Sequence, residues 1–105
     1  MLEGEGMQTQ LISKLTDKAK AYGKYECSYY EKVQLQKNVS SEHKASYENS
    51  IVECENGMNQ ELKAFNNLLI QSKIETDHIY LIGLYVDGDH LAFRNNIERL
   101  LNARE

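Results

Sequence analysis

The fold is decided by residues 8–37, which read QTQLISKLTDKAKAYGKYECSYYEKVQLQK. Gaps of three and four residues alternate between seven positions of this segment, and six of the seven are apolar or aromatic: Ile12, Leu15, Ala19, Tyr22, Glu26, Tyr29 and Val33. This spacing places side chains on one face of an α-helix, at the a and d positions of a coiled-coil heptad. The segment therefore predicts a long amphipathic helix with a single apolar seam.

A second segment, residues 42–73, keeps the same rhythm after a short break in which Ser40 or Ser41 suits the N-cap position. Its seam consists of Tyr47, Ile51, Cys54, Met58, Glu61 or Leu62, Phe65, and Leu68 or Leu69. The pair Asn56-Gly57 is typical of a turn, but the seam passes through it in register. We therefore expect one continuous helix, which forms an antiparallel helical hairpin with the first.

Residues 75–105 leave two interpretations open. The run from Ile79 to Val86 is rich in strand formers, and Asp87-Gly88 suits a two-residue turn. An α+β chain with a β-hairpin at about 78–93 is therefore the alternative fold. Against it, the run is apolar on every side instead of alternating, and helical spacing resumes directly after the turn.

We favour two short helices for this region. Thr76 or Asp77 caps the first of them, Gly88 ends it, and Asp89 caps a last helix over about 90–103. The predicted fold class is all-α: a small helical bundle built on a long antiparallel helical hairpin with two shorter C-terminal helices.

Composition bounds the domain and its partners. The 105 residues suffice for one domain, which we assign to residues 8–105, with residues 1–7 as a flexible leader or a cloning remnant. The longest apolar run has eight residues, against the roughly 20 that span a bilayer, so no membrane partner is expected. The formal net charge of −4 disfavours nucleic-acid binding and leaves a basic protein partner open.

The two cysteines, Cys27 and Cys54, are thirteen residues before and fourteen after Ser40. A hairpin that bends there brings them to nearly the same height on neighbouring helices. We expect two small buried hydrophobes in a reduced, cytoplasmic protein and leave a disulfide bond open. Two cysteines at this spacing match neither a disulfide scaffold nor a zinc pattern.

The strongest candidate for a metal or ligand site is the set His78, Asp87, Asp89 and His90. Carboxylates and imidazole bind divalent ions, although the spacing is not that of an EF-hand. Helix-capping aspartates around a turn are the simpler interpretation. No catalytic motif or phosphate loop stands out, so we expect neither an enzyme nor a cofactor.

Seven tyrosines with no tryptophan are unusual in so short a chain, and four of them form a band on the first predicted helix: Tyr22, Tyr25, Tyr29 and Tyr30. Tyrosine is enriched at protein interfaces, because its ring can be buried while its hydroxyl stays hydrogen-bonded. Closing the edge of a small core is the simpler role for the band. Stacking on single-stranded nucleic acid, with nearby lysines, is a third role.

The sequence favours a non-enzymatic protein-interaction module: a small regulator, adaptor or inhibitor that docks its Tyr-rich helical face on a protein partner. A homodimer is a further expectation, because a partly covered seam leaves apolar surface for self-association. Glu26 within the seam would fix the register of such pairing. The alternative function is a small ligand- or metal-binding module, or an enzyme, that uses residues 78–90.

Overall fold

The computed structural model describes residues 2–103, without the side chains of residues 2–5 and 7. Within this range the chain forms four helices and no strand: α1 (Leu2–Lys37), α2 (Ser41–Gln71), α3 (His78–Val86) and α4 (His90–Ala103). The predicted all-α fold is confirmed, and the alternative β-hairpin at about 78–93 is wrong. The residues after Asp87-Gly88 form a helix because apolar side chains at helical spacing bury against the hairpin.

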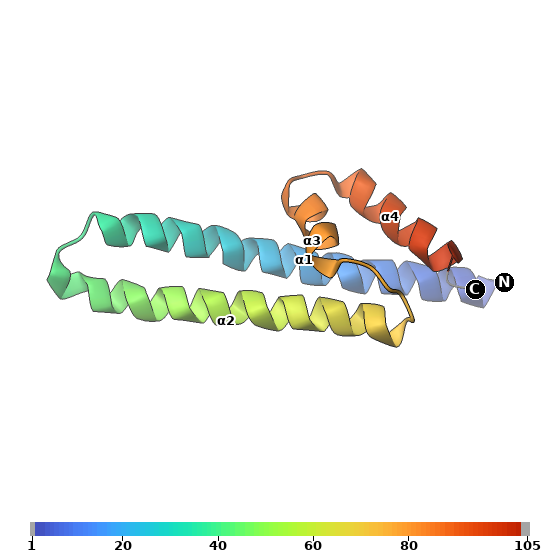
Figure 1. Cartoon of the computed structure of the whole chain (residues 1–105), viewed down its shortest axis with the longest axis horizontal. Coiled ribbons are helices and arrows are strands. Elements are labelled where there is room, and N and C mark those ends of the chain that lie inside the picture. The colour runs from blue at the N-terminus through green and yellow to red at the C-terminus, as the bar shows by residue number, and fades with distance from the viewer. Residues whose placement is uncertain (1, 104–105) are drawn as a thin grey trace.

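Helices α1 and α2 form the predicted antiparallel hairpin, which extends over the whole length of the molecule (Figure 1). Helix α1 begins at Leu2, earlier than the predicted start near Gln8. The assignment of residues 1–7 as a leader or cloning remnant stays a prediction, and Met1 lies outside the described residues. Helix α2 follows the N-cap residue Ser40 and continues through Gly57 without a break, as the seam predicts.

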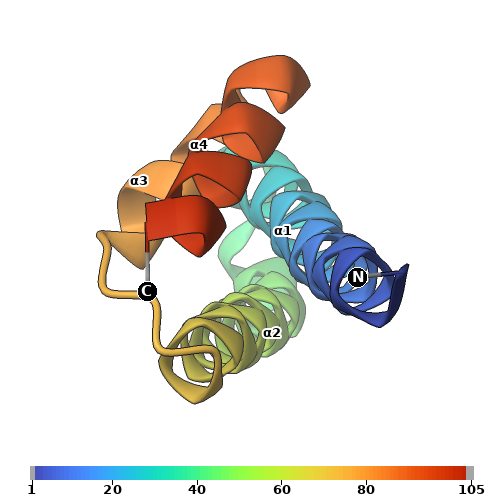
Figure 2. The ribbon, with the colours of Figure 1, turned by 90° about the vertical axis from the view of Figure 1, so that its right-hand side faces the viewer.

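The hydrophobic core lies at one end of this hairpin, where α3 and α4 pack on it. Seen along the long axis, α1, α2 and the α3–α4 pair occupy three corners of the molecule (Figure 2). Each helix contributes buried side chains to one cluster: Leu15, Ala19, Phe65, Leu69, Ile74, Leu81, Ile82, Phe93, Ile97 and Leu101. The short helices are therefore stabilised chiefly by tertiary packing, as helices of their length require.

The rest of the hairpin extends beyond α3 and α4 as two helices alone (Figure 1). We call residues 25–57 the arm, and the other described residues the head. The molecule measures 60 × 23 × 21 Å, because the 36 residues of α1 alone extend over about 54 Å. No residue of the arm belongs to the core cluster, and its buried apolar side chains are Ile51 and Cys54.

The connections in the head follow the capping rules. The Asp77 carboxylate accepts hydrogen bonds from the backbone of Ile79 and Tyr80 at 3.0 and 3.2 Å, and Asp89 accepts one from Ala92 at 3.1 Å. Gly88, between the two short helices, has a φ of 93°. These contacts confirm the predicted caps and the predicted end of α3.

Helix α2 ends in a Schellman motif that the sequence does not announce. The Ile74 amide donates to the Leu69 carbonyl at 2.9 Å and the Lys73 amide to the Ile70 carbonyl at 3.0 Å. Lys73 has a φ of 60°, the left-handed conformation for which glycine is usual at this position. The motif turns Ile74 back into the core, where it contacts the same cluster as Leu69.

Candidate interaction site

The predicted tyrosine band lies on α1 where the head meets the arm. Tyr30 is 60% exposed and Tyr25 is 40% exposed, while Tyr22 and Tyr29 are half-buried. The rings of Tyr29 and Tyr30 meet edge to face, with their centroids 5.3 Å apart. The band therefore combines two rings that are half-buried with two that offer apolar surface to solvent.

Tyr25 packs directly on the backbone of α2. A Cβ atom placed on Gly57 would lie 2.5 Å from ring carbons Cδ1 and Cε1 of Tyr25, much closer than any real contact. Gly57 is buried because this ring covers it. The glycine that resembles a turn signal in the sequence thus provides space for a tyrosine of the opposite helix.

Tyr22 is linked to the polar seam residue Glu26. Burial of the phenol, the neighbouring carboxylate charge and a hydrogen bond to Glu26, and a smaller effect of Tyr30, all raise the pKa of Tyr22 above its usual value of 10.0. The hydroxyl donates this bond, because the carboxylate can only accept. Tyr22, Glu26 and Tyr30 are four residues apart, so they form one row along α1.

A concave site, which we call the corner, lies between α3 and the base of the arm. Its volume is about 230 Å³, and it is lined by Tyr22, Glu26, Leu62, Ile79, Ile82, Gly83, Val86 and Asp87. Ile79 is 62% exposed despite its size. Sequence reasoning missed the corner, because its walls come from three helices whose relative placement no motif specifies.

The two cysteines differ in burial, and neither is in a disulfide bond. Cys54 is buried as predicted, but Cys27 is exposed, so the prediction of two buried thiols is wrong for Cys27. Cys27 lies one residue beyond the seam position of Glu26, and a step of 100° carries its side chain out of the α1–α2 interface. It instead lines a shallow depression beside the end of α3, together with Lys20, Lys24 and His90.

The residues of the candidate metal site have separate roles in the structure. Asp89 caps α4, and the His90 ring stacks on Tyr85 with a centroid distance of 4.1 Å. His78 and Asp87 lie at opposite ends of α3. Among residues 2–103, no group of three or more His, Cys, Asp or Glu side chains is arranged to hold a metal ion.

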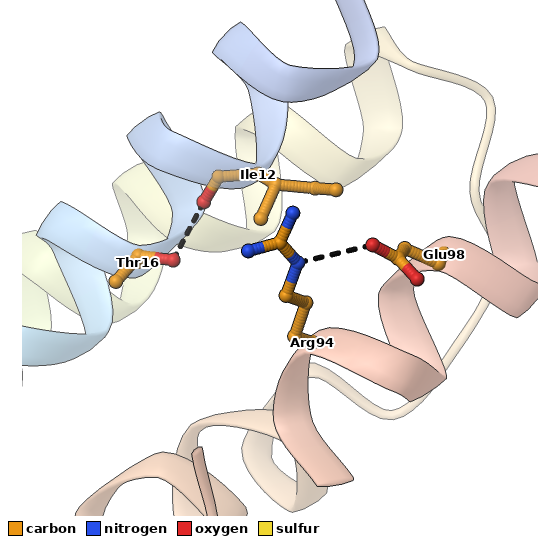
Figure 3. A network of polar contacts seen from close by, with 4 residues as sticks. All are labelled: Ile12, Thr16, Arg94 and Glu98. Atoms are coloured by element: carbon orange, nitrogen blue, oxygen red, sulfur yellow. Dashed lines mark hydrogen bonds and ion pairs between the residues drawn. The ribbon is translucent and has the colours of Figure 1, made fainter. Parts of the chain in front are cut away.

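Polar contacts between the described side chains are few and mostly local. Arg94 donates from Nε to Oε1 of Glu98 at 3.0 Å, and the Thr16 hydroxyl donates to the Ile12 carbonyl at 2.7 Å (Figure 3). Exposed pairs within one helix stabilise it only weakly. The ion pair between helices α1 and α2 joins Lys18 Nζ to Glu61 Oε2 at 3.5 Å.

The arm carries most of the net negative charge of the chain. Six carboxylates, those of Glu26, Glu31, Glu42, Glu48, Glu53 and Glu55, are accompanied by three lysines in residues 25–57, which gives −3 of the formal net charge of −4. Lys18–Glu61 and Arg94–Glu98 are the ion pairs found among the described side chains. The carboxylates of the arm therefore have no ion-pair partner among the described side chains.

Comparison of the chain with protein-family models, with curated proteins and with solved structures finds no match. No helix in the described part of the chain has the length and apolar character to cross a membrane.

Proposed function

We propose that this chain is a non-enzymatic protein-interaction module, a small regulator, adaptor or inhibitor, that docks the tyrosine face of its arm on a protein partner. The observation that carries the proposal is the bare arm. Two helices alone cannot cover all of their apolar side chains, and Tyr30, Leu35 and Val52 are 60%, 43% and 48% exposed there. Such uncovered apolar side chains offer a partner surface that it can bury on binding.

The composition of the arm supports docking on a protein. Tyrosine contributes a large contact area at a low cost in conformational entropy, and it retains a polar group for the rim of an interface. The cytoplasm is the compartment that we assign, because thiols remain reduced there. A second copy of the chain is the competing partner, and the mass of the purified protein distinguishes the two cases.

The test is affinity capture from the native host, with partners identified by mass spectrometry and then titrated as purified proteins. Tyr30→Ala should weaken binding, while Tyr80→Ala should not. The two side chains are a matched pair, since Tyr80 is 57% exposed but lies in the head. Equal effects of both substitutions would contradict docking through the arm. Light scattering across a concentration series tests for a homodimer.

The alternative function, a ligand- or metal-binding module or enzyme at residues 78–90, has a simple test of its own. A divalent ion that raises the melting temperature of the wild type, but not of Asp87→Asn or His90→Ala, would support it. No contact between these side chains favours that function over docking through the arm.

A further inference from the structure

We propose that the corner receives the apolar anchor of a basic amphipathic helix that lies along the arm. This inference rests on the proposed function, because it specifies the chemistry of the partner and the place where it is anchored.

The walls of the corner suit an apolar side chain. Leu62, Ile79, Ile82 and Val86 line it, and Ile79 is 62% exposed without any covering segment in residues 2–103. Gly83 widens the site, since a Cβ atom at this position would meet no other atom within 4 Å. Concave apolar sites of this kind hold the anchor residues of helices bound in grooves.

The rim of the corner suits a cation. Glu26 and Asp87 line it, no lysine or arginine does, and neither carboxylate is in an ion pair within the described residues. Helix α3 also ends here, so the negative end of its dipole adds to the potential. With a charge of −3 on the arm, complementarity favours a basic partner and disfavours an acidic one.

The row from Tyr22 through Glu26 to Tyr30 gives the partner its direction. Tyr22 and Glu26 line the corner, and Tyr30 continues the row onto the arm with 60% of its surface exposed. Eight residues of α1 extend over about 12 Å, which is about two turns of a bound helix. The bound helix would place an apolar anchor at Tyr22, a cation one turn later at Glu26, and a second apolar residue two turns later at Tyr30.

The probe for the test is a fluorescein-labelled, 14-residue amphipathic peptide of leucine and lysine, with its leucine–glutamate counterpart as the control. Fluorescence anisotropy is measured at about 150 mM salt, where non-specific attraction between exposed charges is screened. The lysine peptide should bind and the glutamate peptide should not. Equal binding of both peptides would overturn the inference.

Matched variants locate the binding site. Ile79→Ala and Glu26→Gln should each weaken binding by about tenfold, the usual loss at an anchor position. Leu91→Ala and Glu75→Gln should change it less than twofold, because Leu91, 71% exposed, lies on α4, and the exposed Glu75 lies outside the arm and does not line the corner. Equal effects of the matched variants would contradict a specific site.

Gly83→Leu blocks the corner and separates loss of binding from loss of folding. Because glycine weakens a helix, this variant should melt at a higher temperature than the wild type and yet bind the lysine peptide at least tenfold more weakly. Unchanged binding would overturn the inference. A captured partner that fails to bind Tyr30→Ala and still binds Gly83→Leu would support docking through the arm and contradict anchoring in the corner. If the protein forms a homodimer and Gly83→Leu dissociates it, the corner binds a second copy of the chain. That result would overturn the inference of a basic helical partner.

Discussion

The ring of Tyr25 packs on Gly57, so close that a Cβ atom on Gly57 would be 2.5 Å from two ring carbons. This contact joins α1 to α2 at the base of the arm, beyond the reach of the core cluster. It explains why a glycine occurs in the middle of a long helix, where it costs about 1 kcal/mol relative to alanine. Close approach of a ring to the backbone replaces the stability that an alanine would supply.

The first prediction concerns this pair. Gly57→Ala should fail to stabilise the wild type, because the new methyl group displaces the Tyr25 ring. In a Tyr25→Ala background the same substitution should stabilise the fold by about 1 kcal/mol, the helix propensity of alanine over glycine. Urea unfolding of the wild type, the two single variants and the double variant gives the coupling energy between Tyr25 and Gly57. We expect this energy to exceed about 1 kcal/mol. Additive effects would show that the ring does not need the glycine.

The second prediction concerns the end of α2. Lys73→Gly should stabilise the protein by about 0.5–1 kcal/mol, because glycine adopts the left-handed conformation of a Schellman motif without strain. Lys63→Gly is the matched control: it removes an exposed lysine from the interior of the same helix and should destabilise by about 1 kcal/mol. Thermal or urea unfolding measures both, and a loss of stability in Lys73→Gly would contradict the geometry at this position.

The hairpin was predictable because its two seams have a period that only a helix satisfies, and because the register persists through Gly57. The caps were predictable from local chemistry, since Asp77 and Asp89 precede apolar runs. The division into head and arm was not predictable, because it depends on where α3 and α4 pack along a seam that looks uniform in sequence. The corner and the end of α2 at Lys73 depend on the same packing. No residue type in the sequence indicates either feature.

The exposure of Cys27 could not be predicted from its position along the chain. Its sequence distance from the bend gives its height along the hairpin, but not its rotation about the axis of α1. Glu26 holds the seam position, so the neighbouring thiol points elsewhere. The four tyrosines of the band lie on one helix, as the sequence predicts, and their role as a contact surface stays a prediction. The packing of Tyr25 on Gly57 could not be predicted from one helix, because it depends on how α1 and α2 pair.

The third prediction concerns the Lys18–Glu61 pair. Oε2 of Glu61 is buried without a hydrogen bond, and Lys18 Nζ at 3.5 Å is its ion-pair partner. Lys18→Met should therefore destabilise the fold by about 1 kcal/mol, because it leaves a partly buried carboxylate unpaired. Adding Glu61→Met should restore stability to at least the wild-type level. If the double variant is the least stable of the set, the pair is a net stabiliser.

The fourth prediction concerns pH. Because the pKa of Tyr22 is raised by burial and by Glu26, the unfolded chain loses this proton at a lower pH than the folded protein. The protonated phenol therefore contributes to the free energy of unfolding. This contribution is fully present below pH 10.0 and is lost as the pH rises through the pKa of Tyr22 in the folded protein. Urea midpoints between pH 8 and 11 should fall less steeply for Tyr22→Phe than for the wild type. Tyr80→Phe, which removes an exposed phenol in the head, should follow the wild type.

The last prediction uses the two thiols to check the rotation of α1. Cys27 is exposed and Cys54 is buried, so a thiol reagent such as dithionitrobenzoate should modify one cysteine of the native protein rapidly. The second should react only through opening of the hairpin, at a rate that rises with urea, because a buried thiol is inaccessible in the folded state. Cys27→Ser should abolish the rapid phase and Cys54→Ser the slow one. Rapid reaction of both would show that the arm opens readily, whereas protection of both would place Cys27 back in the seam and contradict the packing of α1 on α2.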